Sequence, residues 1–343
     1  MKNIFVTREI PDEGLKMLKA KKGLKITIPK GDNRISRKDL LNGVAHADVL
    51  LSLLTDKIDA EVMDAAPNLK LIANYAVGFD NIDLRAAMER GITVTNTPAL
   101  EVSEAVAEHA IALIFALAHR VVETDKFARA GKYKGWGPQL LLGSDIHGKT
   151  LGIIGSGAIG TALARRMHDG FGVNVIYTDL SPNKTLEQKY GAKRVSQTEL
   201  LKNADIVSLH IPLLPSTRHL ISTKELASMK KTALLINTAR GPIVDEKALI
   251  KALMKNEIAG AGLDVFECEP LIDCDPSDTL ELRKLPNVIL TPHTASATVG
   301  ARQAMSRVAA ENILAFISGK KAPNAVDMSL FKSKKTKAKK TKK

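Results

Sequence analysis

Short apolar runs alternate with longer amphipathic segments along most of this chain. In the N-terminal part, runs of strand length rich in Val, Ile and Leu are separated by segments with helical spacing. The runs cover residues 2–7, 25–28, 49–53, 71–74 and 93–95. Alternation of this kind predicts a parallel sheet covered by helices on both faces. We therefore predict a first doubly wound α/β domain.

The same alternation resumes in the second half of the chain. Strands are predicted at 151–154, 173–177, 206–210, 233–237, 261–265 and 288–290, and helices at 161–168, 196–202, 223–228 and 245–255. A helix over 105–122 is apolar on nearly every face, which predicts burial between domains or subunits. A final helix over 301–318 is predicted to return to the first domain. The expected domains are therefore 1–98 plus 293–328, and 99–292.

A dinucleotide fingerprint lies between two of these predicted strands. The run Gly155-Ser156-Gly157-Ala158-Ile159-Gly160 follows one strand directly and opens a helix, and Asp179 ends the next strand. The first glycine permits a tight turn, the second a close approach of backbone N–H groups to a pyrophosphate, and the third close helix packing. Asp179 lies nineteen residues beyond Gly160, where its carboxylate can accept hydrogen bonds from ribose hydroxyls and repel a 2′-phosphate. The pattern predicts NAD rather than NADP, with NADH preferred over NADPH.

Composition narrows the class of protein. The chain has 343 residues, of which 45% are hydrophobic and 25% charged, as expected for globular domains. The longest apolar run, Ala110–Ala118, is too short to span a bilayer, and the N-terminus lacks an apolar signal core. We therefore expect a cytoplasmic protein without a membrane anchor. Cys268 and Cys274 match no zinc motif and suggest no disulfide framework, which predicts reduced thiols.

The basic charge is concentrated at the C-terminus. Residues 332–343 carry eight lysines and no acid, so they leave only +5 of the net charge of +13 to the rest of the chain. Such a run cannot build a core, and residues 329–343 are predicted to be a disordered tail. A solubilising extension is the favoured interpretation, and weak contact with nucleic acid or an anionic membrane is the alternative.

A second ligand-binding segment is predicted in the first domain. Residues 74–83 follow a strand, at the edge of an open α/β sheet where ligands bind. Backbone N–H groups around Val77 and Gly78, preceded by Ala76, can bind a substrate carboxylate as a small nest. An ordinary βα turn explains the same residues equally well.

Polar groups follow three of the later strands. Arg240, Glu269 and His293 come after separate predicted strands and can converge on one crevice. His293 is suited to donate a proton to a carbonyl oxygen, Glu269 to stabilise its imidazolium, and Arg240 to bind the carboxylate and carbonyl of a 2-keto acid. Each residue alone fits a surface or turn position, but together beside a dinucleotide fold they predict hydride transfer. The other histidines, including His109 and His210, lack such a constellation and are treated as structural. No metal site is predicted.

These motifs resemble the D-isomer-specific 2-hydroxyacid dehydrogenases. The resemblance rests on GSGAIG (155–160), NTARGPIVDE (237–246), GAGLDVFECEP (260–270) and TPHTASAT (291–298), and extends to about residue 328. It implies a flavodoxin-like substrate domain, a Rossmann NAD-binding domain, and a catalytic set of Arg240, Glu269 and His293. Asp264 then matches the carboxylate that holds the nicotinamide amide. The further cofactor-binding positions are His210, Pro212, Thr217, Thr238 and Ala239.

The resemblance also implies a homodimer through the coenzyme domain and closure of the two domains during turnover. The chain looks most like the glyoxylate and hydroxypyruvate reductase branch, which predicts NADH-dependent reduction of a small 2-keto acid to the 2-hydroxy acid, as the D-isomer where chiral. D-3-phosphoglycerate dehydrogenase, or another D-2-hydroxyacid dehydrogenase, is the alternative enzyme. A corepressor-like protein that senses NADH is the alternative of another class. The stretch 271–284 is longer than is usual in this family and is acidic. Trp136 lies in a glycine-rich loop and is predicted to be an interface or packing residue.

Overall fold

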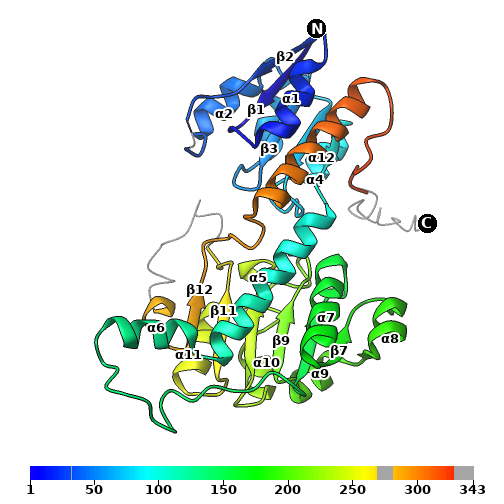
Figure 1. Cartoon of the computed structure of the whole chain (residues 1–343). Helices are drawn as coiled ribbons and strands as arrows, with labels where there is room; N and C mark the ends of the chain where they lie inside the picture. The colour runs from blue at the N-terminus through cyan, green and yellow to red at the C-terminus, as the bar shows by residue number, and fades with distance from the viewer. Residues whose placement is uncertain (32, 269–280, 328–343) are drawn as a thin grey trace, which may run out of the picture. The chain divides into compact units, whose positions relative to one another are not determined.

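The computed structural model describes residues 1–31, 33–268 and 281–327. It contains two compact units (Figure 1). The first unit is Met1–Ala99 together with the residues from Arg302 onward, and the second is Leu100–Ala301. Each unit has a parallel sheet with helices beside it, so the predicted α/β class is confirmed.

The first unit has a five-stranded parallel sheet in the order β2-β1-β3-β4-β5, which is the flavodoxin-like order. Its elements are β1 (Lys2–Val6), α1 (Asp12–Ala20), β2 (Leu24–Thr27), α2 (Arg37–Val44), β3 (Val49–Leu53), α3 (Ala60–Asp64), β4 (Leu71–Tyr75), α4 (Leu84–Glu89), β5 (Thr93–Thr95) and α12 (Val299–Ile317). One buried cluster joins Phe5, Leu50 and Ile72 of the sheet to helices α2, α3 and α4.

Helices α1 and α12 pack closely against each other in this unit. The Ser306 hydroxyl of α12 accepts a hydrogen bond from the Gly14 N–H of α1 at 3.0 Å and donates to the Pro11 carbonyl. A Cβ at Gly14 would lie 2.0 Å from the Ser306 carbonyl oxygen, so the contact requires glycine. The C-terminal helix therefore belongs to the core of the first unit although it is distant in sequence.

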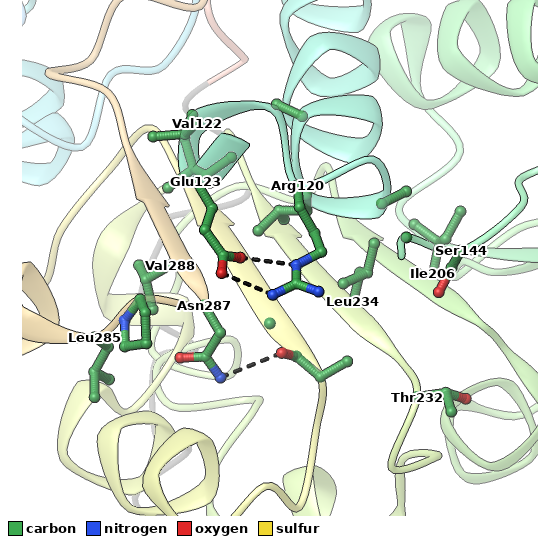
Figure 2. A pocket seen from close by; sticks show the side chains of 18 of the residues that line it. Arg120, Val122, Glu123, Ser144, Ile206, Thr232, Leu234, Leu285, Asn287 and Val288 are labelled. Carbon is green, nitrogen blue, oxygen red and sulfur yellow. Dashed lines mark hydrogen bonds and ion pairs between the residues drawn. The ribbon is translucent and has the colours of Figure 1, made fainter. Parts of the chain in front are cut away.

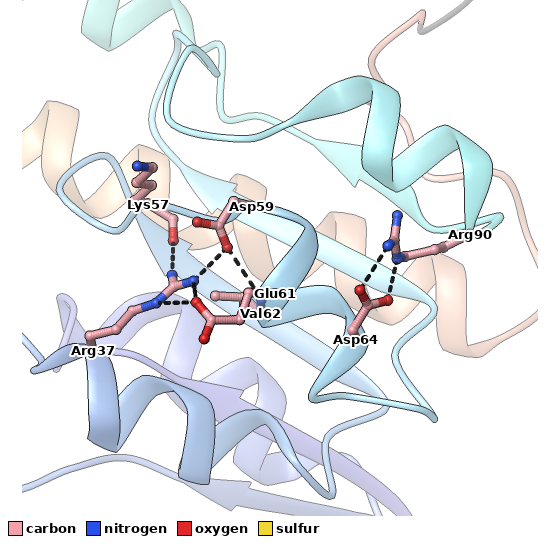
Figure 3. A network of polar contacts seen from close by, with 7 residues as sticks. All are labelled: Arg37, Lys57, Asp59, Glu61, Val62, Asp64 and Arg90. Carbon is pink, nitrogen blue, oxygen red and sulfur yellow. Dashed lines mark hydrogen bonds and ion pairs between the residues drawn. The ribbon is translucent and has the colours of Figure 1, made fainter.

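Surface ion pairs tie α2 and α4 to helix α3 (Figure 3). Arg37 of α2 donates to Asp59, to Glu61 and to the Lys57 carbonyl, and Asp59 also caps α3 by accepting from the Val62 N–H. Arg90 binds both oxygens of Asp64 at 2.7 and 2.9 Å. Exposed ion pairs of this kind contribute little to stability, so they orient the helices more than they stabilise the unit.

The second unit has a seven-stranded parallel sheet in the order β12-β11-β10-β9-β6-β7-β8. Its strands are β6 (Thr150–Ile154), β7 (Asn174–Thr178), β8 (Lys193–Arg194), β9 (Ile206–Leu209), β10 (Leu234–Asn237), β11 (Gly260–Leu263) and β12 (Val288–Leu290). Its helices are α5 (Leu100–Ala118), α6 (Val121–Arg129), α7 (Ala158–Phe171), α8 (Lys184–Tyr190), α9 (Gln197–Asn203), α10 (Thr223–Ser228), α11 (Glu246–Met254) and the 3₁₀ turns Gly241–Ile243 and Leu282–Lys284. The strand order reverses between β6 and β9, and this switch point is where such sheets bind ligands.

Consecutive strand residues of this sheet enter two different cores. Ile153 and Ile236 pack with α5 and α7 on one face, whereas Ile154 and Leu235 pack with α9, α10 and α11 on the other. Because side chains alternate along a strand, a strand buried on both faces must be apolar at every position. This explains the unbroken apolar runs in the sequence.

The helix predicted over 105–122 starts earlier in the structure and also ends earlier. Helix α5 begins at Leu100 and ends at Ala118, because Arg120 adopts a left-handed φ of 55° before α6 starts. The α6 helix has no buried residue, so of these two helices only α5 contributes side chains to the core. Among the described helices none alone has the length and hydropathy of a membrane span, and α5 and α6 reach them only as a pair bent by 58°.

Only one of the two cysteines, Cys268, can be compared with the expectation of reduced thiols. Cys268 is buried, with 6% of its surface exposed, and is not a free thiol. The prediction of a reduced thiol is therefore wrong at this position. Cys274, residues 271–280 of the acidic stretch and the lysine tail lie outside the described residues.

Candidate active site

The dinucleotide fingerprint forms the turn between β6 and α7. Gly155 has a φ of +97°, and a Cβ there would lie 2.4 Å from the His210 carbonyl oxygen. A Cβ at Gly160 would lie 2.2 Å from the Gly155 carbonyl oxygen. Gly157 is the N-cap of α7, and a Cβ there would meet nothing within 4 Å. The first and third glycines are therefore required by packing, while the second faces open space at a helix N-terminus, which favours an anion.

The other predicted residues of this segment surround the same turn. Ser156 is buried at 7% exposure, and Ala158 and Ile159 form the first turn of α7. Asp179 follows β7, and its carboxylate accepts hydrogen bonds from the Ser156 N–H and hydroxyl at 2.7 and 2.8 Å. The structure thus brings the predicted pyrophosphate and ribose contacts together.

A second turn with predicted cofactor residues follows β9. The Thr217 hydroxyl donates to the Pro212 carbonyl at 2.7 Å and accepts from the Leu214 N–H at 2.8 Å, which closes the loop on itself. His210 lies at the start of this loop, and its Nε2 is 2.9 Å from the Ser208 hydroxyl. His210, Pro212 and Thr217 therefore belong to one turn, at the strand next to the fingerprint strand β6.

An unsatisfied polar atom marks the end of β10. The Thr238 hydroxyl oxygen is buried and has no hydrogen-bond partner in the described part of the chain. Buried polar groups normally have partners, so this atom points to a missing ligand. At these two positions, the unsatisfied hydroxyl of Thr238 and the open space at Gly157 are compatible with a bound dinucleotide.

Arg240 is held by the turn that follows Thr238 and Ala239. The Asn237 side chain accepts from the Ala239 N–H at 3.0 Å and donates to the Arg240 carbonyl at 2.9 Å. A Cβ at Gly241 would lie 1.6 Å from the Phe266 carbonyl oxygen. The Arg240 turn therefore contacts the segment after β11 at a point where only glycine fits.

Asp264 organises the segment that carries His293. Its carboxylate is fully buried and accepts from the Thr291 hydroxyl at 2.6 Å, the Thr294 N–H at 2.8 Å and the Ala295 N–H at 2.8 Å. Burial alone would raise the pKa of Asp264, but hydrogen bonds from His109, Thr291 and the backbone lower it, so the group is an anion. The family resemblance predicts that Asp264 holds the nicotinamide amide, and in the structure its carboxylate also anchors the His293 segment.

His293 itself has a constrained backbone. Its N–H donates to the Asp264 carbonyl at 2.8 Å and to the Thr291 carbonyl at 3.0 Å, and its φ is 53°, in the left-handed region. Left-handed backbone at a non-glycine residue is uncommon and persists where surrounding contacts fix it. The strands that lead to Arg240, Asp264 and His293 are the neighbours β10, β11 and β12. Arg240 and His293 are thus brought to one edge of the sheet.

Two residues outside the predicted set lie close to its segments in the structure. His109 of α5 places Nε2 2.9 Å from the Thr291 hydroxyl and 3.4 Å from the Asp264 carboxylate. Its contacts are long-range in sequence, so no local pattern marks this histidine as part of the site. Glu267 pairs with His219 at 2.5 Å and with Arg218 at 3.3 Å. Glu269, the predicted partner of His293, lies outside the described residues.

The predicted substrate loop of the first unit is fixed through its carbonyl groups. Asn74 donates to the Gly78 carbonyl at 2.9 Å, Asn96 to the Val77 carbonyl at 2.7 Å, and the Thr97 N–H to the Ala76 carbonyl at 2.9 Å. Because all three carbonyls are held, the peptide planes of the loop are set. Such a fixed loop suits anion binding through the backbone N–H groups at Val77 and Gly78.

One cavity of the second unit is lined by none of these residues. Figure 2 shows residues that line it. The cavity has a volume of about 550 Å³ and is lined by α5, α6 and the residues that precede β9, β10 and β12, including Asp205, Thr232 and Asn287. Arg120 and Glu123 pair within it at 2.7 Å. It therefore sits at the amino ends of the strands and contains no predicted site residue.

Burial of His210 makes the stability of the protein sensitive to acid. Burial lowers the pKa of His210 from 6.5 to about 4. The unfolded chain binds this proton more readily than the folded one, so stability is fully present above the unfolded pKa and is lost as the pH falls towards the folded pKa.

We expect the free energy of unfolding, measured in urea, to fall between about pH 6.5 and about pH 4 in the wild type. The fall should be smaller in His210→Gln, because glutamine cannot take up the proton. Equal pH dependence in the two proteins would show that His210 does not contribute.

A doubly wound sheet with a fingerprint turn, a ribose-side carboxylate, and Arg and His at neighbouring strand ends defines a dinucleotide-binding oxidoreductase. Residues 111–295 match the family described as D-isomer specific 2-hydroxyacid dehydrogenase, NAD binding domain. A glyoxylate reductase of Korarchaeum cryptofilum is 48% identical over 330 residues, covering 96% of this chain and 97% of the relative.

Solved structures are also similar to this chain over most of its length. A crystal structure of a protein from Thermus thermophilus has a TM-score of 0.86 and 44% identity, covering 94% of this chain and 99% of that one. The NADPH-dependent glyoxylate/hydroxypyruvate reductase of Sinorhizobium meliloti in complex with citrate has a TM-score of 0.80 and 31% identity, covering 96% and 98%. The chain belongs to the D-isomer specific 2-hydroxyacid dehydrogenase family, and it is a nicotinamide-dependent oxidoreductase that acts on keto acids.

Proposed function

We propose that this protein reduces glyoxylate and hydroxypyruvate to the corresponding 2-hydroxy acids with NADH. The observation that carries the proposal is the buried Asp264, which fixes the His293 segment beside the turn that carries Arg240. The similarity to glyoxylate reductases supports the choice of substrate. The carboxylate at Asp179 supports NADH, although one similar solved structure is of an NADPH-dependent reductase.

The proposed chemistry is hydride addition to the C2 carbonyl and proton transfer to its oxygen. The 155–160 turn, Asp179 and the segments at 210–217 and 238–239 would hold NADH, which would supply the hydride when bound. His293 donates the proton that converts the developing alkoxide to a hydroxyl, and Glu269 stabilises the imidazolium before donation. Arg240 polarises the carbonyl and is a candidate to bind the substrate carboxylate. In the first unit, the backbone at residues 76–78 is also a candidate to bind a substrate carboxylate.

Product analysis tests this assignment. Purified full-length protein should convert hydroxypyruvate to glycerate of the D configuration and glyoxylate to glycolate. Turnover of 3-phosphohydroxypyruvate well above that of hydroxypyruvate would instead indicate a phosphoglycerate dehydrogenase. No turnover of any 2-keto acid, with NADH still bound, would favour a sensor of NADH, and deletion of residues 331–343 would then be tested for loss of partner binding.

We also propose a homodimer formed through the second unit. The α6 helix has no buried residue, and the loop that follows exposes Tyr133, Trp136 and Leu142 by 58%, 84% and 64%. Apolar side chains exposed together in this way are typical of an interaction surface. Light scattering should give twice the chain mass, and Trp136→Ser should raise the dimer dissociation constant about tenfold or more, since aromatic residues dominate interfaces. A monomeric wild type would contradict the proposal.

A further inference from the structure

We propose that Ser156 sets the cofactor preference by locking the Asp179 carboxylate in place, and that Arg194 is a cation held out of reach of a 2′-phosphate by the same arrangement. The inference deepens the proposed function and rests on its NADH preference. It concerns a contact between two protein side chains, in addition to the cofactor contact expected for Asp179.

The lock consists of charge-assisted hydrogen bonds from both sides of the carboxylate. Oxygen Oδ2 of Asp179 accepts from the Ser156 N–H at 2.7 Å and from the Ser156 hydroxyl at 2.8 Å. Oxygen Oδ1 accepts from the Leu180 N–H at 2.6 Å. The carboxylate is therefore fixed by the β6–α7 turn and by the residues after β7 at once. Rotation away from the ribose position would break these bonds.

The same contacts keep Asp179 charged. Its partial burial alone would raise the pKa of the carboxyl group, but the hydrogen bonds from Ser156, Leu180 and Ser181 outweigh this effect and lower the pKa. A carboxylate accepts hydrogen bonds from the two hydroxyls of the NADH ribose and repels the phosphate of NADPH. The repulsion requires that the carboxylate stay where it is, which is the role we assign to Ser156.

Arg194 holds the opposite charge against the backbone of the same turn. Its guanidinium donates to the Asp179 carbonyl at 2.8 Å and to the Leu180 carbonyl at 2.9 Å. These bonds hold the arginine against the backbone of the Asp179 turn, and the residue is exposed on the short strand β8. An arginine near this position is a typical partner of a 2′-phosphate. In this proposal, Arg194 becomes a partner for a 2′-phosphate only when the Asp179 carboxylate no longer repels that phosphate.

The measurement is the ratio of the dissociation constants of NADPH and NADH, obtained by fluorescence titration of the purified full-length protein. Ser156→Ala should lower this ratio about tenfold, equivalent to about 1.4 kcal/mol, which is typical of one hydrogen bond to a charged group. In the double variant Ser156→Ala/Arg194→Gln, NADPH should bind more weakly than in Ser156→Ala. Ser181→Ala is the matched control, since it removes a hydroxyl near Asp179 but keeps the N–H donor.

The outcomes separate this inference from the proposed function. A wild type that binds NADPH as tightly as NADH would refute the cofactor preference itself. A wild type that prefers NADH, with an unchanged ratio in Ser156→Ala, would refute the lock and leave the preference intact. Equal weakening of both cofactors would also refute it, because that is the result of a structural role alone. If Ser156→Ala does not fold, Asp179→Asn tests the same charge from the other side, and an unchanged ratio there refutes the inference.

Discussion

Replacement of His293 by alanine should lower kcat/KM for glyoxylate by a factor of about 10² or more, because general acid catalysis contributes about 10²–10⁴-fold. The dissociation constant of NADH should stay close to that of the wild type, since the fingerprint turn and Asp179 are untouched. Steady-state rates and fluorescence titration with NADH measure the two quantities separately.

The left-handed backbone at His293 calls for a second variant. Asparagine tolerates a φ of 53° better than most residues, so His293→Asn keeps the turn while removing the imidazole. Both variants should be equally inactive if the proton donor is what has been lost. His46→Ala, at an exposed position of the first unit, serves as the control and should be unchanged. Wild-type rates in His293→Asn would remove His293 from the mechanism.

Among the site glycines, Gly241 is the one where an added methyl group should lower stability and activity most. The added Cβ would lie 1.6 Å from the Phe266 carbonyl oxygen and 1.8 Å from its carbon, so the Arg240 turn and the segment after β11 must separate. Overpacking of this kind costs about 3 kcal/mol or more of unfolding free energy. Displacement of Arg240 by about 1 Å should lower kcat/KM about 10²-fold as well.

Gly170 provides the matched control for this substitution. It lies in helix α7, and a Cβ there would meet nothing within 4 Å. Alanine at this position should stabilise the protein by up to about 1 kcal/mol, because it lowers the entropy of the unfolded chain. Urea unfolding of both variants gives the comparison. A Gly241→Ala protein as stable and active as Gly170→Ala would show that the two segments need not touch.

The sequence predicts the strands of both sheets well because most are buried on both faces and are apolar throughout. Strand β8 is missed, since Lys193 and Arg194 are exposed charges that pair at a sheet edge. The end of α5 is missed for a different reason. The apolar spacing continues past Ala118, and only the left-handed backbone of Arg120 ends the helix.

Sequence patterns likewise identify only part of the candidate site. Glycines and strand-end polar residues are visible locally, so Gly155, Gly160 and Arg240 could be selected from the sequence. The contacts of Asp264 with Thr291 and Ala295, and that of His109 with Thr291, join residues far apart in the chain. Local patterns carry no information on such pairs. Treating His109 as a structural residue therefore left out its contact with the His293 segment.

Reduction of keto acids with NADH is tested most directly by the initial rate of NADH oxidation when purified wild-type protein is mixed with glyoxylate or hydroxypyruvate. We predict saturable oxidation of NADH with both acids. The kcat/KM for NADH should be well above the kcat/KM for NADPH. Absence of any keto-acid-dependent loss of NADH absorbance, in protein that binds NADH, would contradict the proposed function.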